Sequence, residues 1–406
     1  MITKQKTSKI KIALVLIISA LVCLLILTSC IDFFPENFFS ESEGSEFSEF
    51  AAEYENLLRM IDQLFIGEFN AAEIHAETMR ALIMALDDEW SFYMTRAEFE
   101  SFLQRAANIY TGIGVEIVYN HEIGGMEIVR VYRGSPAEAG GMLPGDVMFY
   151  VDGENIRDAN ITQIRSLLAR PLGDYAIITV FRDDSIIDLK IMYYEIFLDP
   201  ISYEIIDGDI GYVLISNFDA GSGERFVYTV EDLVSRGVTG FIFDVRLNSG
   251  GSVRELTTAL DFLLPEGEIF IHVNKQGEER ITYSDEYWLD MPAVVLVNRY
   301  SYSAAEYFAA MLSEYDYAPS VGEQTTGKNR SQTTHPIPDG GALHISTGQY
   351  LTKNRVSLRD AGGFTPEYII EHTDEELVAL ITGNLDINDD PQMQKAISLL
   401  RAMMNN

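Results

Sequence analysis

From residue 196 to about residue 370, short apolar runs alternate with helical segments, and this alternation limits the fold more than any other feature of the sequence. Three of these runs are rich in Ile, Val, Leu and Phe: Ile210–Ile215, 240–245 and Ala293–Val297. Each run has the length of a strand, and the segments between them have the apolar spacing of helices. Alternating strands and helices are typical of α/β proteins. The sequence therefore predicts an α/β core here.

The rest of the 406-residue chain has other patterns, and its 47% of hydrophobic residues is enough for two or three compact domains. Between residues 50 and 104, apolar residues recur at three- and four-residue spacings, which indicates helices. Between residues 105 and 195, short strands are separated by glycine turns. We therefore expect a multidomain α/β protein with an amino-terminal helical segment (50–104), a β-rich domain (105–195), and an α/β core that ends in carboxyl-terminal helices (196–406).

The amino end has the pattern of a targeting segment. Four lysines between positions 4 and 11 precede an uncharged stretch, residues 12–29, as in a secretory signal. The stretch ends in Leu27-Thr28-Ser29-Cys30, which resembles the bacterial lipobox, in which Cys30 would be lipidated. Residues 1–29 are thus predicted to be a lipoprotein signal peptide and residues 30–49 a tether, with an uncleaved single-span anchor as the alternative. Both interpretations put the rest of the chain on the extracytoplasmic face of a bacterial cell membrane.

Charge and cysteine content exclude several classes of function. The chain has 29 Lys and Arg against 62 Asp and Glu, a net charge of -33, which argues against nucleic acid as a partner. Its two cysteines, Cys23 and Cys30, exclude a disulfide framework and a four-cysteine metal site. No His-Glu-x-x-His pattern is present in the sequence. We expect neither a metal nor another cofactor.

The β-rich segment contains a glycine loop, Gly112-Ile113-Gly114, followed by Gly-Ser-Pro-Ala at 134–137 and by a Gly-Asp pair at 145–146. These motifs, in this order, resemble those of PDZ domains. The resemblance implies that backbone N–H groups of Gly112, Ile113 and Gly114 receive the terminal carboxylate of a peptide. Some domains of this kind serve as gates, so a PDZ-like fold does not by itself imply that the domain binds peptides.

The run Ala293–Val297 leads into a sharp turn and then into a helix with small residues in its first turn. Ser303 lies where this helix starts, and backbone N–H groups at a helix start can stabilise a developing oxyanion. Ser303 and Glu306 also form the sequence of a capping box, so that the serine could merely cap its helix. This segment alone favours the cap.

Two further segments change this interpretation. Lys328 lies in a glycine turn after Val-Gly-Glu, with Gln332 four residues on, and residues 248–251 form an Asn-Ser-Gly-Gly turn after a strand. Together with the serine segment they resemble the carboxyl-terminal processing proteases, or tail-specific proteases, which use a Ser/Lys dyad. The resemblance implies a nucleophile, Ser303, a base, Lys328, and an orienting amide, Gln332. It further implies an oxyanion hole formed by Gly250, Gly251 and Ala304.

The chemistry of the dyad requires that the lysine can lose its proton. A serine hydroxyl is a weak nucleophile until a base removes its proton. Lysine can act as that base where apolar surroundings lower its pKa from roughly 10.4. His335 and His344 lie near the lysine in sequence and are the alternative bases. Tyr302 and Thr326 depart from the family's pattern, which bears on substrate preference more than on the dyad.

We therefore predict a lipid-anchored serine endopeptidase that recognises the free carboxyl-terminal tail of proteins or peptides through its PDZ domain. The main rival is a non-catalytic PDZ-type receptor with the same fold, and a different hydrolase on a similar core is a third interpretation. The expected partners are protein or peptide substrates and, through the lipid anchor, the membrane. The sequence is also compatible with an oligomer.

Overall fold

The computed structural model describes residues 46–120, 123–132, 134–157, 159 and 161–405. The predicted signal peptide, Cys30 and most of the tether lie outside this part of the chain. Within the described residues, no helix is both long enough and apolar enough to cross a membrane. The chain divides into two compact units, and each is described by itself.

The smaller unit contains residues 46–101, 273–278 and 330–349. Apolar residues at helical spacing form its helices, which agrees with the predicted helical segment. Helix α4 starts with the Thr95–Glu98 capping box, in which the Glu98 carboxylate accepts the Thr95 N–H at 2.8 Å. Strand β1 was not foreseen in the sequence and pairs antiparallel with β18, which also pairs with β17. The elements are α2 (Glu46–Leu64), α3 (Ala71–Met84), β1 (Phe92–Met94), α4 (Arg96–Ala106), β17 (Arg330–Pro336) and β18 (Ala342–Leu351).

The larger unit begins with a β-rich part. One sheet has the strand order β3-β4-β5-β7-β8, with β6 added to β5, and β2 and β9 form a separate antiparallel pair. This leaves β3 as an edge strand next to the glycine loop. The elements are β2 (Ile109–Thr111), β3 (Val115–Asn120), β4 (Gly125–Val131), α5 (Pro136–Ala139), β5 (Val147–Val151), β6 (Glu154–Asn155), α6 (Ile161–Leu168), β7 (Tyr175–Arg182), β8 (Ser185–Met192) and β9 (Glu195–Phe197).

The second part of this unit is an α/β core around a sheet in the order β10-β11-β12-β15-β16-β19. Strand β10 is antiparallel to β11, and the other neighbours are parallel. The elements are β10 (Ile201–Ile206), β11 (Ile210–Ile215), α7 (Ser222–Ser235), β12 (Gly240–Asp244), α8 (Val253–Leu263), β13 (Gly267–Asn274), β14 (Glu279–Ser284), β15 (Ala293–Val297), α9 (Ala304–Glu314), β16 (Ser320–Gly322), β19 (Tyr368–Ile369), α10 (Asp374–Ile381) and α11 (Pro391–Met404).

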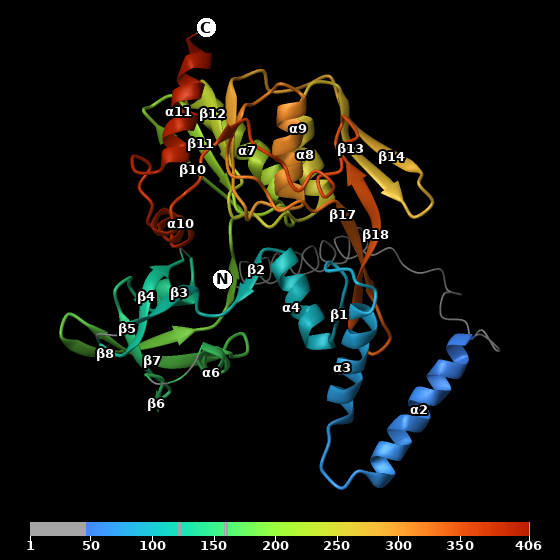
Figure 1. Cartoon of the computed structure of the whole chain (residues 1–406). Helices are drawn as coiled ribbons and strands as arrows, with labels where there is room; N and C mark the ends of the chain where they lie inside the picture. Colours follow the sequence, from blue (N-terminus) through green and yellow to red (C-terminus); the bar gives the residue numbers. More distant parts are fainter. Residues whose placement is uncertain (1–45, 121–122, 133, 158, 160, 406) are drawn as a thin grey trace, which may run out of the picture. The chain divides into compact units, whose positions relative to one another are not determined.

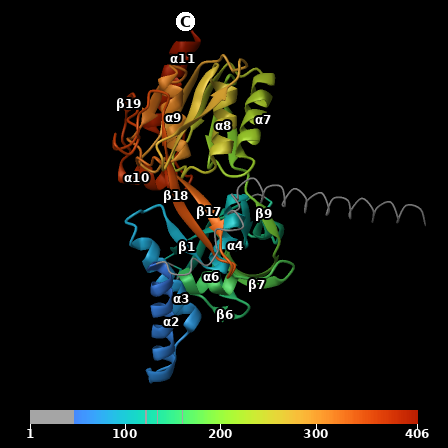
Figure 2. The same ribbon diagram turned by 90° about the vertical axis from the view of Figure 1, so that its right-hand side faces the viewer.

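Helices cover both faces of this sheet, which explains why its central strands are apolar throughout. Helices α7, α8 and α9 lie side by side in both views (Figures 1 and 2), and their buried residues pack on Phe241 and Phe243. Alternate residues such as Ile242 point to the other face, where they pack with Met393 and Leu400 of α11. Parallel strands end at one edge of a sheet, so β12 and β15 bring the segments that follow them together. These segments are the Asn-Ser-Gly-Gly turn at residues 248–251, called the Gly-Gly turn below, and the turn at residues 298–303 that contains Ser303, called the serine turn.

Candidate active site

The serine turn has a strained backbone at Ser303. This residue has φ 59° and ψ -122°, although it is not a glycine. It is half-buried between β15 and α9, and the small side chains of Ala304 and Ala305 behind it are buried. A non-glycine residue in this region persists only where its surroundings fix it, and such residues cluster at active sites. Ser303 therefore lies in a strained strand-to-helix turn, the kind of turn that carries the serine in a nucleophile elbow.

The Glu306 carboxylate joins the serine turn to the loop at residues 323–329, which contains Lys328 and is called the lysine loop below. The side chain is fully buried, and its Oε1 accepts the N–H of Ser303 at 2.9 Å and the N–H of Lys328 at 2.6 Å. Its Oε2 accepts the Thr325 hydroxyl at 2.7 Å and the Gly327 N–H at 2.9 Å. Burial raises the pKa of Glu306, and these hydrogen bonds act in the opposite direction. Glu306 is thus more than the capping residue predicted from the sequence, because one carboxylate oxygen contacts the backbones of both predicted dyad residues.

The lysine loop is shaped by a required glycine. Gly327 has φ 90°, and a Cβ there would lie 2.8 Å from the Gly363 nitrogen. The half-buried Lys328 follows, and its carbonyl oxygen accepts the Tyr350 hydroxyl at 2.5 Å. The loop can therefore follow its path only with glycine before the lysine.

Tyr350 is a site residue that the sequence analysis missed. Burial raises the pKa of its hydroxyl far above the usual value, and so does the nearby Glu306, whereas a hydrogen bond with the Ser303 side chain lowers it. The tyrosine thus contacts the predicted nucleophile and, through the Lys328 carbonyl, the lysine loop. No local motif surrounds this tyrosine, so only the fold identifies it.

The Gly-Gly turn lies against the serine turn. A Cβ at Gly250 would lie 2.8 Å from the Ser303 Cβ and 2.9 Å from the Ala304 nitrogen. A Cβ at Gly251, where φ is 149°, would lie 2.3 Å from the Phe218 carbonyl carbon. The Gly250 N–H donates to Asn248 Oδ1 at 2.7 Å. The structure thus brings Gly250, Ser303 and Ala304 together, with one of the predicted donors bonded to its own turn.

Buried polar side chains fasten the two turns to each other. The Ser301 hydroxyl donates to the Val245 carbonyl at 2.7 Å, and the Leu247 N–H donates to Asn298 Oδ1 at 3.0 Å. Ser301 and Asn298 are fully buried. Two residues of the serine segment therefore hold the chain that leads into the Gly-Gly turn.

An acidic residue lies beside the Gly-Gly turn. The Asp219 nitrogen would be 2.9 Å from a Cβ at Gly251. Burial raises the pKa of the Asp219 carboxyl to about 6, against the opposing effect of Arg105. Burial thus makes this carboxyl lose its proton at a higher pH than an ordinary aspartate does.

The remaining residues predicted around the dyad are described within their own unit. Gln332 belongs to the smaller unit, where its amide donates to the Arg330 carbonyl at 3.0 Å and to the Ser346 hydroxyl at 3.1 Å. Its role at Ser303 stays a prediction. His335 and His344 belong to the same unit and bond to Thr333 and Thr334, respectively.

In the PDZ-like part, the predicted peptide-binding loop is anchored by the Ile113 side chain, which is buried in the local core. Gly114 has φ 76°, and a Cβ there would lie 2.3 Å from the Ser135 Cβ, so the turn needs glycine. No group of three or more His, Cys, Asp or Glu that could hold a metal occurs among the residues described.

Comparison with known proteins finds two matching families within the chain. Residues 209–370 match peptidase family S41, and residues 127–182 match the PDZ domain. The chain is 29% identical over 277 residues to the carboxy-terminal processing protease CtpA of Bacillus subtilis, an alignment that covers 68% of this chain. It spans 59% of the length of that relative.

Two solved structures share the fold. The photosystem II D1 C-terminal processing protease aligns over 86% of this chain and 92% of its own, with a TM-score of 0.50 and 21% identity. A putative S41 protease from Bacteroides fragilis aligns over 80% and 90%, with a TM-score of 0.57 and 18% identity. The predicted resemblance and fold class are therefore confirmed: the chain matches the peptidase region of family S41, with a PDZ match ahead of it in sequence, and carboxyl-terminal processing proteases are among its relatives.

Proposed function

We propose that the chain is a serine endopeptidase in which Ser303 is the nucleophile and Lys328 is the general base. The observation that carries this proposal is the shared contact of both residues with Glu306 Oε1. The strained backbone of Ser303 and the adjacent Gly250 turn support it.

In this reaction the neutral Lys328 amine takes the proton of the Ser303 hydroxyl while the oxygen attacks the scissile carbonyl carbon. The negative charge that develops on the carbonyl oxygen needs fixed N–H donors. Gly251 and Ala304 are the candidates, and Gly250 can join them if its N–H leaves Asn248. The lysine then returns the proton to the leaving amine, and water hydrolyses the acyl-enzyme by the same route. Gln332 orients the lysine amine in this proposal.

The PDZ domain supplies substrate selection in this proposal. Strand β3 has a free edge, to which an extended peptide can add as a further strand. The Ile113 and Gly114 carbonyl oxygens accept N–H groups of Ala137 and Tyr132, so these contacts do not consume the loop's own N–H groups. Substrates would be proteins or peptides with a free carboxyl-terminal tail.

We also propose that Cys30 is acylated and anchors the protein on the extracytoplasmic face of a bacterial membrane. The lipobox-like sequence before Cys30 supports this. Cys30→Ala should release the protein from membranes or block its maturation. An unmodified residue 1 on the membrane-bound protein, found by mass spectrometry, would show that the anchor is a different one.

Turnover of an unstructured peptide with a free carboxyl end tests the catalytic proposal. Ser303→Ala, Lys328→Ala and Lys328→Arg should all be inactive, because a guanidinium stays protonated and cannot accept the serine proton. Ser313→Ala, on the same helix as Ser303, is the control and should keep full activity. If Ser303 only caps α9, Ser303→Ala will lose about 0.5–2 kcal/mol of stability and keep its turnover. That result would favour the non-catalytic receptor.

A further inference from the structure

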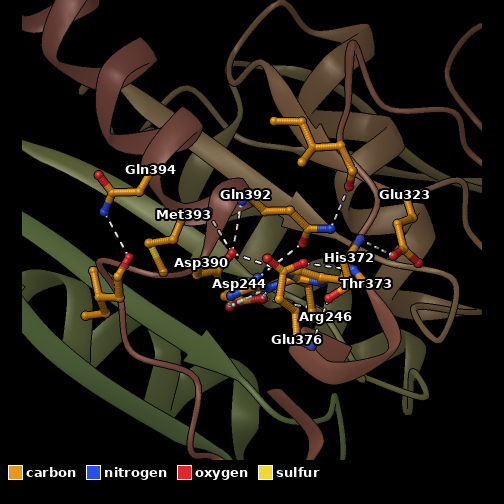
Figure 3. Close-up of polar contacts among 12 residues, drawn as sticks. Asp244, Arg246, Glu323, His372, Thr373, Glu376, Asp390, Gln392, Met393 and Gln394 are labelled. Carbon is orange, nitrogen blue, oxygen red and sulfur yellow. Dashed lines mark hydrogen bonds and ion pairs between the residues drawn. The ribbon is translucent and has the colours of Figure 1, made fainter. Parts of the chain in front are cut away.

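Arg246 is a buried guanidinium that lies among polar side chains from the start of α11 (Figure 3). It is 3% exposed and lies two residues after β12 and two before Asn248. Its Nε lies 3.0 Å from both Asp244 carboxylate oxygens, and its Nη1 donates to Asp390 Oδ2 at 2.7 Å and to Gln392 Oε1 at 3.1 Å. Groups at the start of α11 therefore fix the orientation of a side chain that lies next to the turn in sequence.

Asp390 is itself held in place. It caps α11, where its Oδ1 accepts the N–H groups of Gln392 at 3.0 Å and Met393 at 3.1 Å, and it lies 3.1 Å from His372 Nε2. Burial alone would raise the pKa of Asp390, but the hydrogen bond with His372 and the charge of Arg246 lower it to about 2. The carboxylate opposite Arg246 is therefore charged at neutral pH.

His372 connects this cluster to the serine turn. Its side chain is fully buried, and its backbone N–H donates to Glu323 Oε1 at 3.1 Å. Glu323 Oε2 accepts Arg299 Nε at 2.7 Å, and Arg299 lies four residues before Ser303. A continuous set of contacts thus runs from the segment before the Gly-Gly turn to the segment before the nucleophile.

Stability is a poor explanation for this cluster. Buried ion pairs add little over well-packed apolar residues of the same volume, because desolvation offsets their attraction. What these ion pairs add is a fixed side-chain orientation, since a guanidinium bonded on several sides cannot rotate. An oxyanion site depends on direction, because its donors must already point at the position where charge develops.

We propose that Asp390 and His372 are positioning residues for the site at Ser303. They hold Arg246, and through it residues 247–251, in the geometry that the oxyanion needs. This inference rests on the proposed peptidase function. It predicts a lower kcat with little change in KM, because the affected donors act on the transition state rather than on the bound substrate.

Asp390→Asn in the full chain is the first test. Asparagine caps a helix as well as aspartate does, so α11 keeps its cap while the charge facing Arg246 is lost. We expect kcat to fall about tenfold to hundredfold, in line with the cost of misplacing a reacting group by about 1 Å, and KM to stay within a factor of about two. Glu376→Gln is the matched control, because the Glu376 carboxylate caps α10 and accepts the Thr373 N–H at 2.8 Å. The control should leave both constants unchanged.

Two substitutions of His372 separate positioning from general stability. His372→Gln retains an N–H donor for Asp390 and should recover most of the kcat, whereas His372→Leu removes the donor and should lose as much as Asp390→Asn. All rates are measured at a temperature where circular dichroism shows each variant to be folded. If Asp390→Asn does not fold, the two histidine variants decide.

Hydrogen exchange gives a readout that does not require peptidase activity. Asp390→Asn or His372→Leu should speed exchange of the amides at 247–251 and leave strand β7 unchanged. If the wild type cleaves no peptide, the proposed function fails, while the exchange data still judge the positioning role. Folded variants with wild-type kcat, or with unchanged exchange at 247–251, would overturn the inference.

Discussion

The serine turn and the glycine loop of the PDZ-like part are both short loops, but they are held in different ways. Buried side chains such as Glu306 and Ser301 bond to the backbone of the serine turn and of the chain that leads into the Gly-Gly turn. The Gly112–Gly114 loop is instead held by backbone contacts of the Ile113 and Gly114 carbonyl oxygens and by the buried Ile113 side chain. The difference fits their proposed tasks. A nucleophile and its oxyanion donors must stay in place, whereas a loop that receives a carboxylate needs unused N–H groups.

Glu306→Gln should produce the largest effect, because it removes the carboxylate that bonds to both the serine turn and the lysine loop. Each carboxylate oxygen accepts two donors, so an amide NH2 in either orientation faces donors that it cannot satisfy. We expect kcat to fall about a hundredfold and stability to fall by about 1–3 kcal/mol. Peptide binding to the PDZ domain, measured by calorimetry, should not change.

The matched control is Glu314→Gln, at the other end of the same helix. The Glu314 carboxylate accepts the Thr352 hydroxyl at 2.5 Å and the Asn354 N–H at 2.8 Å. A loss of kcat as large as that of Glu306→Gln would mean that α9 as a whole, rather than the link between the two loops, limits activity.

Acid should destabilise the α/β core through Asp390. Because its pKa is lowered to about 2 from an ordinary value of 3.8, the folded state gains stability above pH 4 and loses it as the pH falls toward 2. The shift corresponds to about 2 kcal/mol above pH 4, of which roughly half is lost by pH 3. Urea unfolding at pH 5.5 and pH 3 measures this, and Asp390→Asn should show a smaller difference between the two. An equal difference in both proteins would assign the acid sensitivity to other groups.

Gly114→Ala tests whether the Gly112–Gly114 loop contributes to substrate binding rather than to the chemical step. Positive φ and the 2.3 Å approach to the Ser135 Cβ both disfavour alanine, so the loop must shift. We expect KM for a peptide with a free carboxyl end to rise about tenfold, equivalent to about 1.4 kcal/mol, with an unchanged kcat. Gly153→Ala is the control, because φ is 83° there too but nothing lies within 4 Å of an added Cβ. A fall in kcat with an unchanged KM would contradict the division of tasks.

The sequence predicts much of the fold, and it singles out candidate site residues whose roles stay predictions. Apolar periodicity indicates the α/β core, and local motifs identify Ser303, Lys328 and the Gly-Gly turn. What it misses depends on contacts between distant segments. Tyr350 has no motif around it, Glu306 has the local pattern of a helix cap, and Asp390 reaches Arg246 across 144 positions of the chain. Strand β1 is only three residues long and exists through its pairing with β18.

Covalent labelling of Ser303 tests the central claim most directly. A phosphonate electrophile that reacts with activated serines is incubated with the wild type and with folded Lys328→Ala and Lys328→Arg, and the adducts are located by mass spectrometry. The account predicts a single adduct on Ser303 of the wild type, formed faster as the pH rises, and a rate at least about a hundredfold lower in both variants. Labelling of Lys328→Ala at the wild-type rate, or an adduct on a different residue, would contradict it.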